Sequence, residues 1–99
     1  MGEIEELMRL LKDRALNNSV RLGILLALYY VGDYMTFNDL WRSLGIPKST
    51  LHKHLTILRD SGLIEYKRGI TIIGVRTIVR LTDEGKAVVR KYLELVSRL

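Results

Sequence analysis

The chain has 99 residues, 47% of them hydrophobic, which is enough for one compact domain with a single core and too little for two. We therefore predict one domain over residues 1–99. The absence of cysteine excludes disulfide bonds, thiolate metal sites and cysteine nucleophiles. The longest strongly apolar stretch, Leu22 to Val31, is shorter than the roughly 20 residues of a membrane span, and the acidic start of the chain is unlike a signal peptide. A cytoplasmic protein with no membrane partner is expected.

The net charge of +5 is unevenly distributed along the chain. Residues 1–41 carry four basic and six acidic side chains, residues 42–80 carry eight and two, and residues 81–99 carry four and three. An excess of positive charge between Arg42 and Arg80 is expected if that segment faces phosphates, but a solvated basic surface gives the same count. The charge distribution thus favours nucleic-acid binding without establishing it.

Apolar residues at helical spacing predict two helices in the first third of the chain. The first runs from about Gly2 to Leu16 and is amphipathic. The second is apolar over most of its circumference, begins at a cap formed by Ser19 and ends at Gly32. This second helix should lie in the core.

Two short helices with a turn between them are predicted next. Thr36 and Asp39 have the spacing of a capping box, which indicates a helix to about Leu44. Pro47 suits the first position of a following helix that reaches about Ser61. A short helix, a glycine-containing turn and a second helix with a polar outer face form a helix-turn-helix.

The pattern changes from helical to extended after this second helix. Strands are predicted over 63–68 and 76–81, with Gly69 and Gly74 on either side of the connection, as an antiparallel hairpin. Thr82 then caps a final helix. The predicted fold class is α+β, mainly α: a winged helix-turn-helix with a two-stranded hairpin as the wing and a C-terminal helix.

The helix after Pro47 has two distinct faces. On a wheel of about 100° per residue, Leu55 and Leu58 fall within about 40° of Leu51, and the polar side chains cluster on the other side. The polar face is of a kind that reads base edges in the major groove. The predicted base-reading residues are Ser49, Thr50, His52, Lys53 and Thr56.

Other basic or polar side chains are better placed for the sugar-phosphate backbone than for bases. The predicted phosphate contacts are Thr36, Asn38, Arg42, Lys48, Lys67, Arg68 and Arg76. Within the terminal segments 1–17 and 82–99, apolar stripes are expected to form a homodimer, because one small domain cannot bury them entirely. These residues are Ile4, Leu7, Leu11, Val89, Tyr92, Val96 and Leu99. If both helices only close the core of the monomer, no dimer follows.

Metal binding and catalysis are not expected. His52 and His54 are two residues apart on a helix and point in opposite directions, so they do not form a ligand pair. His54 should lie at the edge of the core with a hydrogen-bond partner, and His52 should face DNA. Ser49 lies three residues before His52, but no carboxylate is placed to orient that histidine for nucleophilic catalysis. We predict no enzyme activity and no cofactor.

Three stretches together resemble a known family: Val20 to Leu28, Leu40 to Gly69, and the sequence RTIVRLTDEGK of Arg76 to Lys86. They are similar to archaeal and bacterial winged-helix transcriptional regulators related to the MarR and ArsR groups. The resemblance implies DNA binding by the Pro47 to Ser61 helix, wing contacts near Arg68 and Arg76, and dimerisation through the terminal helices. It implies no particular effector.

The predicted wing departs from the usual basic, polar pattern of the family. Its connection contains the apolar, β-prone residues Ile70, Ile72, Ile73 and Val75. Such a run is an aggregation hazard in solvent, so we expect the partner subunit or another protein to cover it, and insertion beside DNA is less favoured. The sequence predicts a homodimeric regulator that binds specific sites in double-stranded DNA; the alternative is a winged-helix protein-interaction module that does not bind DNA.

Overall fold

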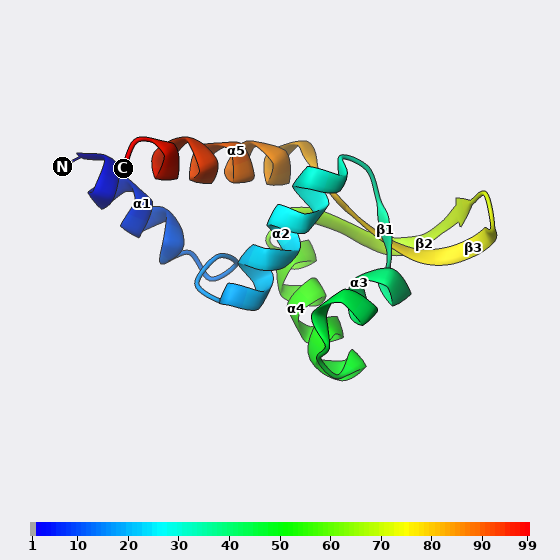
Figure 1. Cartoon of the computed structure of the whole chain (residues 1–99). Helices are drawn as coiled ribbons and strands as arrows, with labels where there is room; N and C mark the ends of the chain where they lie inside the picture. Colours follow the sequence, from blue (N-terminus) through cyan, green and yellow to red (C-terminus); the bar gives the residue numbers. More distant parts are fainter. Residues whose placement is uncertain (1) are drawn as a thin grey trace.

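The computed structural model describes residues 2–99 as five helices and a three-stranded antiparallel sheet (Figure 1). In chain order these are α1 (Gly2–Leu11), α2 (Ser19–Val31), β1 (Met35–Thr36), α3 (Phe37–Leu44), α4 (Lys48–Asp60), β2 (Ile64–Thr71), β3 (Gly74–Leu81) and α5 (Asp83–Ser97). The strand order is β1-β3-β2, with the hairpin of β2 and β3 as the wing. The predicted α+β winged helix-turn-helix, mainly helical, is confirmed.

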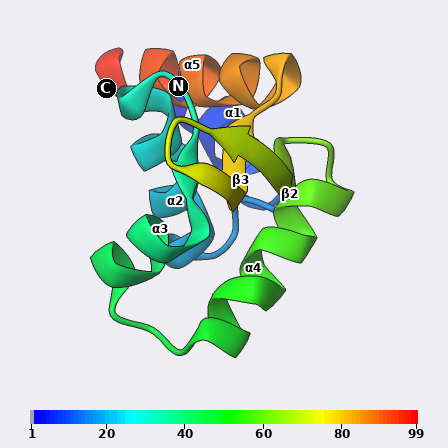
Figure 2. The same ribbon diagram turned by 90° about the vertical axis from the view of Figure 1, so that its right-hand side faces the viewer.

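The core lies between α2, α4, the base of the hairpin and the start of α5. Its fully buried side chains include Ile24, Leu25, Leu28, Leu51, Leu55, Leu58, Val79, Val89 and, from α3, Leu40. Leu95, near the end of α5, is also fully buried but lies outside this cluster. Helix α1 packs along α5 at one end of the molecule, and the hairpin projects from the other end (Figures 1 and 2). The chain is therefore elongated, with principal extents of 49 × 24 × 22 Å.

Helix α1 is shorter than predicted and ends at Leu11 instead of Leu16. The Asp13 carboxylate accepts a hydrogen bond of 2.9 Å from the backbone N–H of Ala15, which forms a turn. The carbonyls of Arg14 and Ala15 accept hydrogen bonds of 2.8 and 3.2 Å from the guanidinium of Arg21. The apolar periodicity predicted one more helical turn here. Instead, the carbonyls of this segment are hydrogen-bonded to Arg21, which also contacts His54 of α4, 33 residues away.

Two predicted helix starts are wrong by one residue. Asn18, not Ser19, caps α2: its side-chain oxygen accepts hydrogen bonds of 2.9 and 3.1 Å from the N–H groups of Val20 and Arg21. Pro47 precedes the first residue of α4 instead of being that residue. The predicted cap of α3 is confirmed, since Thr36 Oγ1 accepts a hydrogen bond of 3.1 Å from Asp39 N.

The hairpin is longer than predicted, and a third strand was missed. Gly69 lies inside β2, paired with Arg76, and only Ile72 and Ile73 separate the two strands. The sequence analysis placed Gly69 and Gly74 at the ends of the connection. The β-branched residues between these glycines favour extended backbone, so the pairing of β2 with β3 continues past Gly69. Strand β1 has two residues, too few for a periodic signal, and pairs with β3 at Val79 and Ile78.

The base of the hairpin is joined to α5 by close packing. Thr82 caps α5 by accepting a hydrogen bond of 3.0 Å from Gly85 N, and its hydroxyl donates to the carbonyl of Gly62 at 2.7 Å. Gly85 is buried against the backbone of Leu63, so that a Cβ atom at this position would collide with the Leu63 carbonyl. The first turn of α5 therefore has no room for a side chain at position 85, and only glycine fits there.

We predict that Gly85→Ala lowers the free energy of unfolding by at least about 1–3 kcal/mol, because the new methyl group forces the backbone apart. Gly23→Ala is the matched control. Gly23 lies inside α2 with open space at its Cβ position, so alanine there should stabilise by up to about 1 kcal/mol through helix propensity. Urea unfolding of the two variants measures both effects, and equal effects would contradict the packing described here.

Candidate nucleic-acid interface

The turn between α3 and α4 is held by specific contacts. Gly45 ends α3 in the left-handed conformation at φ 66°, which glycine adopts without strain. The indole N–H of Trp41 donates a hydrogen bond of 2.8 Å to the carbonyl of Ile46, and the Lys48 ammonium lies 4.5 Å from the centre of the Trp41 ring. These contacts fix the direction in which α4 leaves the turn.

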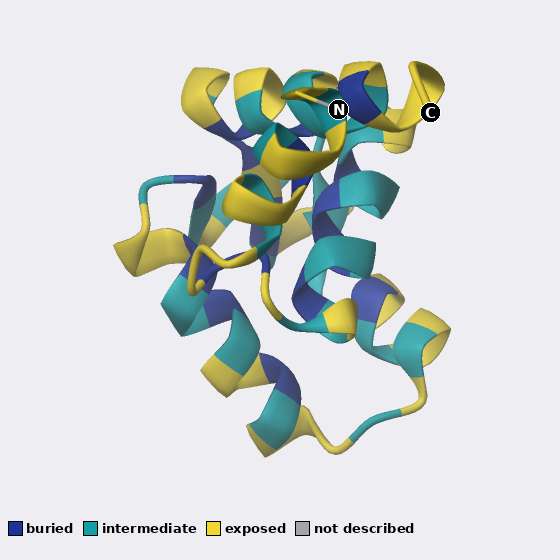
Figure 3. Cartoon of the chain, turned by 90° about the vertical axis from the view of Figure 1, so that its left-hand side faces the viewer, coloured by how far each residue is buried: buried dark blue, intermediate teal, exposed yellow. Residues whose placement is uncertain are grey.

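Helix α4 buries one face and exposes the other (Figure 3). The three leucines predicted to pack are completely buried, and Ser49, His52 and Lys53 are exposed. Thr50 is half-buried. The exposed face presents a hydroxyl, an imidazole and an ammonium group side by side, groups that hydrogen-bond base edges.

Thr56 does not belong to this exposed face, contrary to its predicted role in reading bases. Its hydroxyl oxygen is buried and has no hydrogen-bond partner within residues 2–99. The helical wheel of α4 predicted that Thr56 is exposed. A wheel describes one helix alone, and it does not include strand β2, which packs against α4. A hydroxyl covered in this way cannot contact a base edge.

His52 is linked to the wing through Tyr66, a residue that the sequence analysis missed. The Nδ1 atom of His52 lies 2.9 Å from the Tyr66 hydroxyl. The Tyr66 ring stacks on Phe37, with 6.2 Å between centroids, and burial raises the pKa of its hydroxyl, so that this group stays protonated. Either group can donate this hydrogen bond, depending on which imidazole nitrogen carries the proton. Nothing in the sequence around Tyr66 indicates that it contacts His52.

Four of the predicted phosphate contacts gather around one small hollow. Thr36, Asn38, Arg68 and Arg76 line a cavity of about 160 Å³ between the start of α3 and the hairpin. The Thr36 hydroxyl is used in the cap of α3, and the Arg76 guanidinium donates to the carbonyl of Val75 at 2.8 Å. The exposed cations and the amide beside the positive end of α3 make this hollow suitable for an anion.

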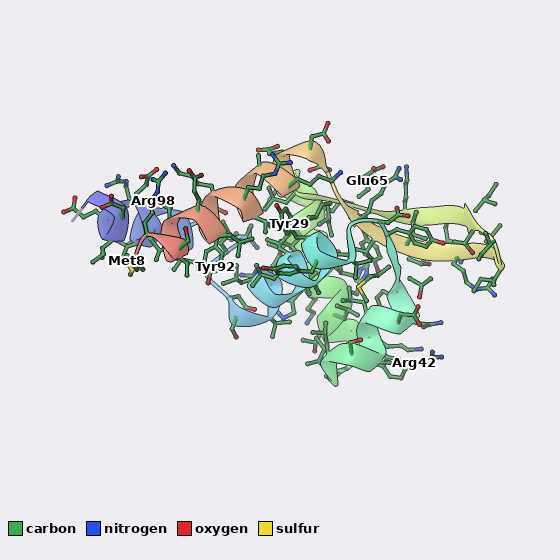
Figure 4. The ribbon with its side chains drawn as sticks, turned by 45° about the horizontal axis from the view of Figure 1, so that its top comes forward. Met8, Tyr29, Arg42, Glu65, Tyr92 and Arg98 are labelled. Atoms are coloured by element: carbon green, nitrogen blue, oxygen red, sulfur yellow. The ribbon has the colours of Figure 1, made fainter. Side chains whose placement is uncertain are left out.

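The other predicted phosphate contacts lie apart from this hollow and have local partners. Arg42 is on the outer side of α3 (Figure 4), with its guanidinium 3.6 Å from the Asp39 carboxylate. Lys67 forms an ion pair of 2.7 Å with Glu65, and Lys48 lies over Trp41. Exposed ion pairs of this kind contribute little to stability.

The buried Arg21 connects the segment between α1 and α2 to α4. The sequence analysis did not predict this contact. Besides the two carbonyls, its guanidinium donates to the side-chain oxygen of Asn17 at 3.0 Å and to Nδ1 of His54 at 3.0 Å. The prediction that His54 lies at the edge of the core with a hydrogen-bond partner is confirmed. Burial and the nearby charge of Arg21 lower the pKa of His54, which favours the neutral ring that this hydrogen bond needs.

The terminal helices bury part of their apolar stripes within the chain. Leu7 and Val89 are buried within the chain, so neither can contact a partner subunit in this conformation: Val89 belongs to the hydrophobic core, and Leu7 lies on α1, which packs on α5. Tyr92 and Leu11 are half-buried. Ile4, Val96 and Leu99 remain exposed, together with Met8, which the sequence analysis had not selected (Figure 4).

A larger cavity of about 520 Å³ lies between the end of α2, the hairpin base and the start of α5. Its walls include Tyr29, Asp33, Lys86 and the Glu65–Arg80 ion pair, whose atoms are 2.8 Å apart. No residue of α4 lines it, so it is separate from the candidate interface. Within residues 2–99 no group of three or more acidic or histidine side chains could hold a metal ion, and no helix is long and apolar enough to cross a membrane.

Comparison with known proteins identifies the class to which this geometry belongs. The family model of the winged helix DNA-binding domain matches residues 20–99, and the chain belongs to this family. The uncharacterized protein MJ0432 of Methanocaldococcus jannaschii is 32% identical over 83 residues, which cover 84% of this chain and 89% of that protein.

Two solved structures show the same fold. The transcriptional regulator homologue from Pyrococcus horikoshii OT3 has a TM-score of 0.81 and 28% identity, over 99% of this chain and 93% of that chain. A protein of Enterococcus faecalis V583 assigned to the MarR family of transcriptional regulators has a TM-score of 0.73 and 20% identity, over 98% and 82%. The predicted resemblance to winged-helix regulators is confirmed: the chain is a winged-helix DNA-binding protein, similar to transcriptional regulators.

The Arg21–His54 contact predicts a loss of stability in mild acid. The ordinary pKa of histidine, about 6.5, applies in the unfolded chain, and the lowered pKa applies in the folded protein. The unfolded state therefore binds the proton more readily, so stability falls as the pH drops below about 6.5 and levels off below the folded-state pKa. His54→Gln retains an acceptor for Arg21 and should remove this component of the pH dependence, whereas His52→Gln should keep it. Urea unfolding between about pH 5 and 8 measures the difference, and identical profiles for the two variants would contradict the assignment.

Proposed function

We propose that the chain acts as one domain over residues 1–99 and is a homodimeric transcriptional regulator that prefers specific sites in double-stranded DNA. The observation that carries this is the exposed face of α4, which presents Ser49, His52 and Lys53. His52 contacts Tyr66, and Tyr66 stacks on Phe37, which lines the same hollow as Arg68 and Arg76. Base-reading groups and phosphate-binding groups are thus linked by direct side-chain contacts. Such a regulator acts where the DNA is, in the cytoplasm of an archaeal or bacterial cell.

In the proposed complex α4 lies in the major groove, which is wide enough to admit a helix. Lys53 and His52 are the strongest candidates for base contacts, because their side chains are exposed and polar at the middle of the helix. With Tyr66 donating to Nδ1, His52 offers its Nε2–H to an acceptor such as guanine N7 or O6. Ser49 and the half-buried Thr50 lie nearer the start of α4.

The hollow between α3 and the hairpin is the proposed phosphate site. Arg68 and Arg76 supply positive charge there, and Asn38 sits in the first turn of α3. Arg42, Lys48 and Lys67 would add further phosphate contacts along the same side of the chain. These contacts set orientation and register on the duplex but do not distinguish its sequence.

The proposed dimer uses the exposed apolar residues of α1 and α5. Ile4, Met8, Val96 and Leu99 are each at least two-fifths exposed. The first three lie on α1 and α5, which pack together, and Leu99 follows the end of α5. A two-fold dimer through these helices would place two copies of α4 on one duplex, as palindromic sites require. The Leu7 and Val89 side chains would support this surface from inside each subunit.

The alternative is a winged-helix protein-interaction module, which the apolar wing favours. The two functions differ in their response to salt. If the chain neutralises several phosphates, its duplex affinity falls steeply as salt increases, whereas an interaction module shows little duplex affinity at any salt concentration.

We predict that Lys53→Ala weakens binding to a selected site by about 1–3 kcal/mol more than binding to scrambled duplex, because a base contact is lost. Arg76→Ala should weaken both duplexes equally and lower the salt slope by about one. Thr56→Val is the matched control on α4: its covered hydroxyl predicts unchanged discrimination. Anisotropy titrations over a salt series measure all three. If Arg76→Ala removed the discrimination and Lys53→Ala did not, the roles of helix and wing would be reversed.

We predict that Val96→Asp converts the dimer to a monomer at micromolar concentration, because it places a charge in an apolar interface. The exposed position means that the fold tolerates the change. Glu94→Lys, a change of charge at another exposed position of α5, is the control; it also removes the Glu94–Arg98 ion pair. Sedimentation equilibrium gives the masses, and a wild-type monomer under the same conditions would contradict the proposed dimer.

A further inference from the structure

The tip of the wing is apolar and almost entirely exposed. Ile72 is 100% exposed and Ile70 90%, with Ile73 at 65% and Val75 at 51%. Ile70 and Val75 are direct partners in the ladder and share one face of the ribbon, and Ile72 and Ile73 form the turn. Together these four residues are the wing tip. They lie at the far end of the hairpin, beyond the body of the protein (Figure 1).

Apart from Glu65 at its base, which pairs with Lys67 and Arg80, the ribbon behind the wing tip carries only basic charges. Between Glu65 and Asp83 the sequence contains Lys67, Arg68, Arg76 and Arg80 and no acidic residue. Arg68 and Arg76 line the hollow directly behind the tip, together with Val75 of the tip itself. An apolar end backed by guanidinium groups is complementary to a nucleic-acid groove, in which stacked bases lie between two rows of phosphates.

A second copy of the chain fits the wing tip less well. A stable protein interface uses about 20–30 residues on each side, and the wing tip offers four at the end of a narrow ribbon. The adjacent arginines would also approach their own copies in a symmetric contact, and like charges repel. Charge and size therefore point to DNA as the occupant.

We propose that Ile72 and Ile73 insert from the minor groove between adjacent base pairs of the bound duplex, as an apolar wedge that unstacks and kinks the DNA. This inference rests on the proposed function, because it requires that the protein binds duplex DNA. Arg68 and Arg76 hold the phosphates beside the insertion point. The exposed apolar surface, which is unfavourable in water, is buried only in this complex.

The dimensions of the groove explain why insertion must deform the duplex. The minor groove of B-DNA is about 6 Å wide, and two paired strands are already about 4.8 Å apart before their side chains are counted. The groove must widen, and branched apolar side chains at its floor then separate one base step. Steps such as TA unstack at the lowest cost, so the wing tip should add a preference for a flexible step at a position that α4 does not contact.

The test uses a duplex that wild-type protein selects from a randomised library, with 2-aminopurine in place of one adenine at the flexible step and fluorophores at both ends. Wild-type protein should raise the 2-aminopurine fluorescence and the end-to-end energy transfer, which report unstacking and bending. Ile72→Ser combined with Ile73→Ser should abolish both signals and weaken binding on the order of tenfold. The salt slope should not change, because no charge is lost.

Two further variants separate the wedge from a general loss of apolar surface. Ile72→Leu combined with Ile73→Leu keeps an apolar tip and should retain both signals. Val31→Ser removes an exposed β-branched side chain at the end of α2 and should leave both signals and the affinity unchanged.

The inference is overturned if wild-type protein binds its duplex without unstacking or bending it, or if the double serine variant behaves like wild type. It is also overturned if that variant loses self-association while its DNA signals persist, since the tip would then belong to a protein interface. These results leave duplex binding itself intact. A wild-type protein that binds no duplex at any salt concentration refutes the proposed function and the wedge with it.

Discussion

The buried guanidinium of Arg21 is the interaction on which the placement of α4 depends. It is the charged residue in the first turn of α2, a predominantly apolar helix, and its hydrogen bonds within residues 2–99 go to two backbone carbonyls, the Asn17 side chain and His54. A buried cation is costly unless its donors are satisfied. The segment between α1 and α2 must therefore fold back over Arg21, and α4 must present a neutral imidazole to it.

Three further contacts keep α4 in place from other directions. The leucine seam packs its inner face, the Trp41–Ile46 hydrogen bond fixes its start, and His52 is bonded to Tyr66 of the wing. The backbone of the exposed face is consequently positioned before any DNA is bound, which lowers the conformational entropy lost on binding.

Local patterns predicted the elements well, because their causes are local. The cap at Thr36, the glycine-containing turn after α3 and the leucine spacing of α4 each depend on residues a few positions apart. Arg21 and Tyr66 escaped prediction because their partners lie 33 and 14 residues away, and nothing in the sequence marks such pairs. Thr56 was misplaced for the same reason, since the hairpin covers a position that the helix alone would expose.

Leu7 and Val89 show that an apolar stripe does not reveal whether its partner is the same chain or a second copy.

The central claim, that α4 reads the major groove, is tested most directly by dimethyl sulfate footprinting on a selected duplex. This reagent methylates guanine N7 in the major groove and adenine N3 in the minor groove, so one experiment reports both sides of the helix. The structure predicts protection of guanine N7 in two blocks about one helical turn apart, one for each α4 of a dimer. A fully bound duplex in which every guanine N7 remains reactive would contradict the assignment of α4 as the reading element.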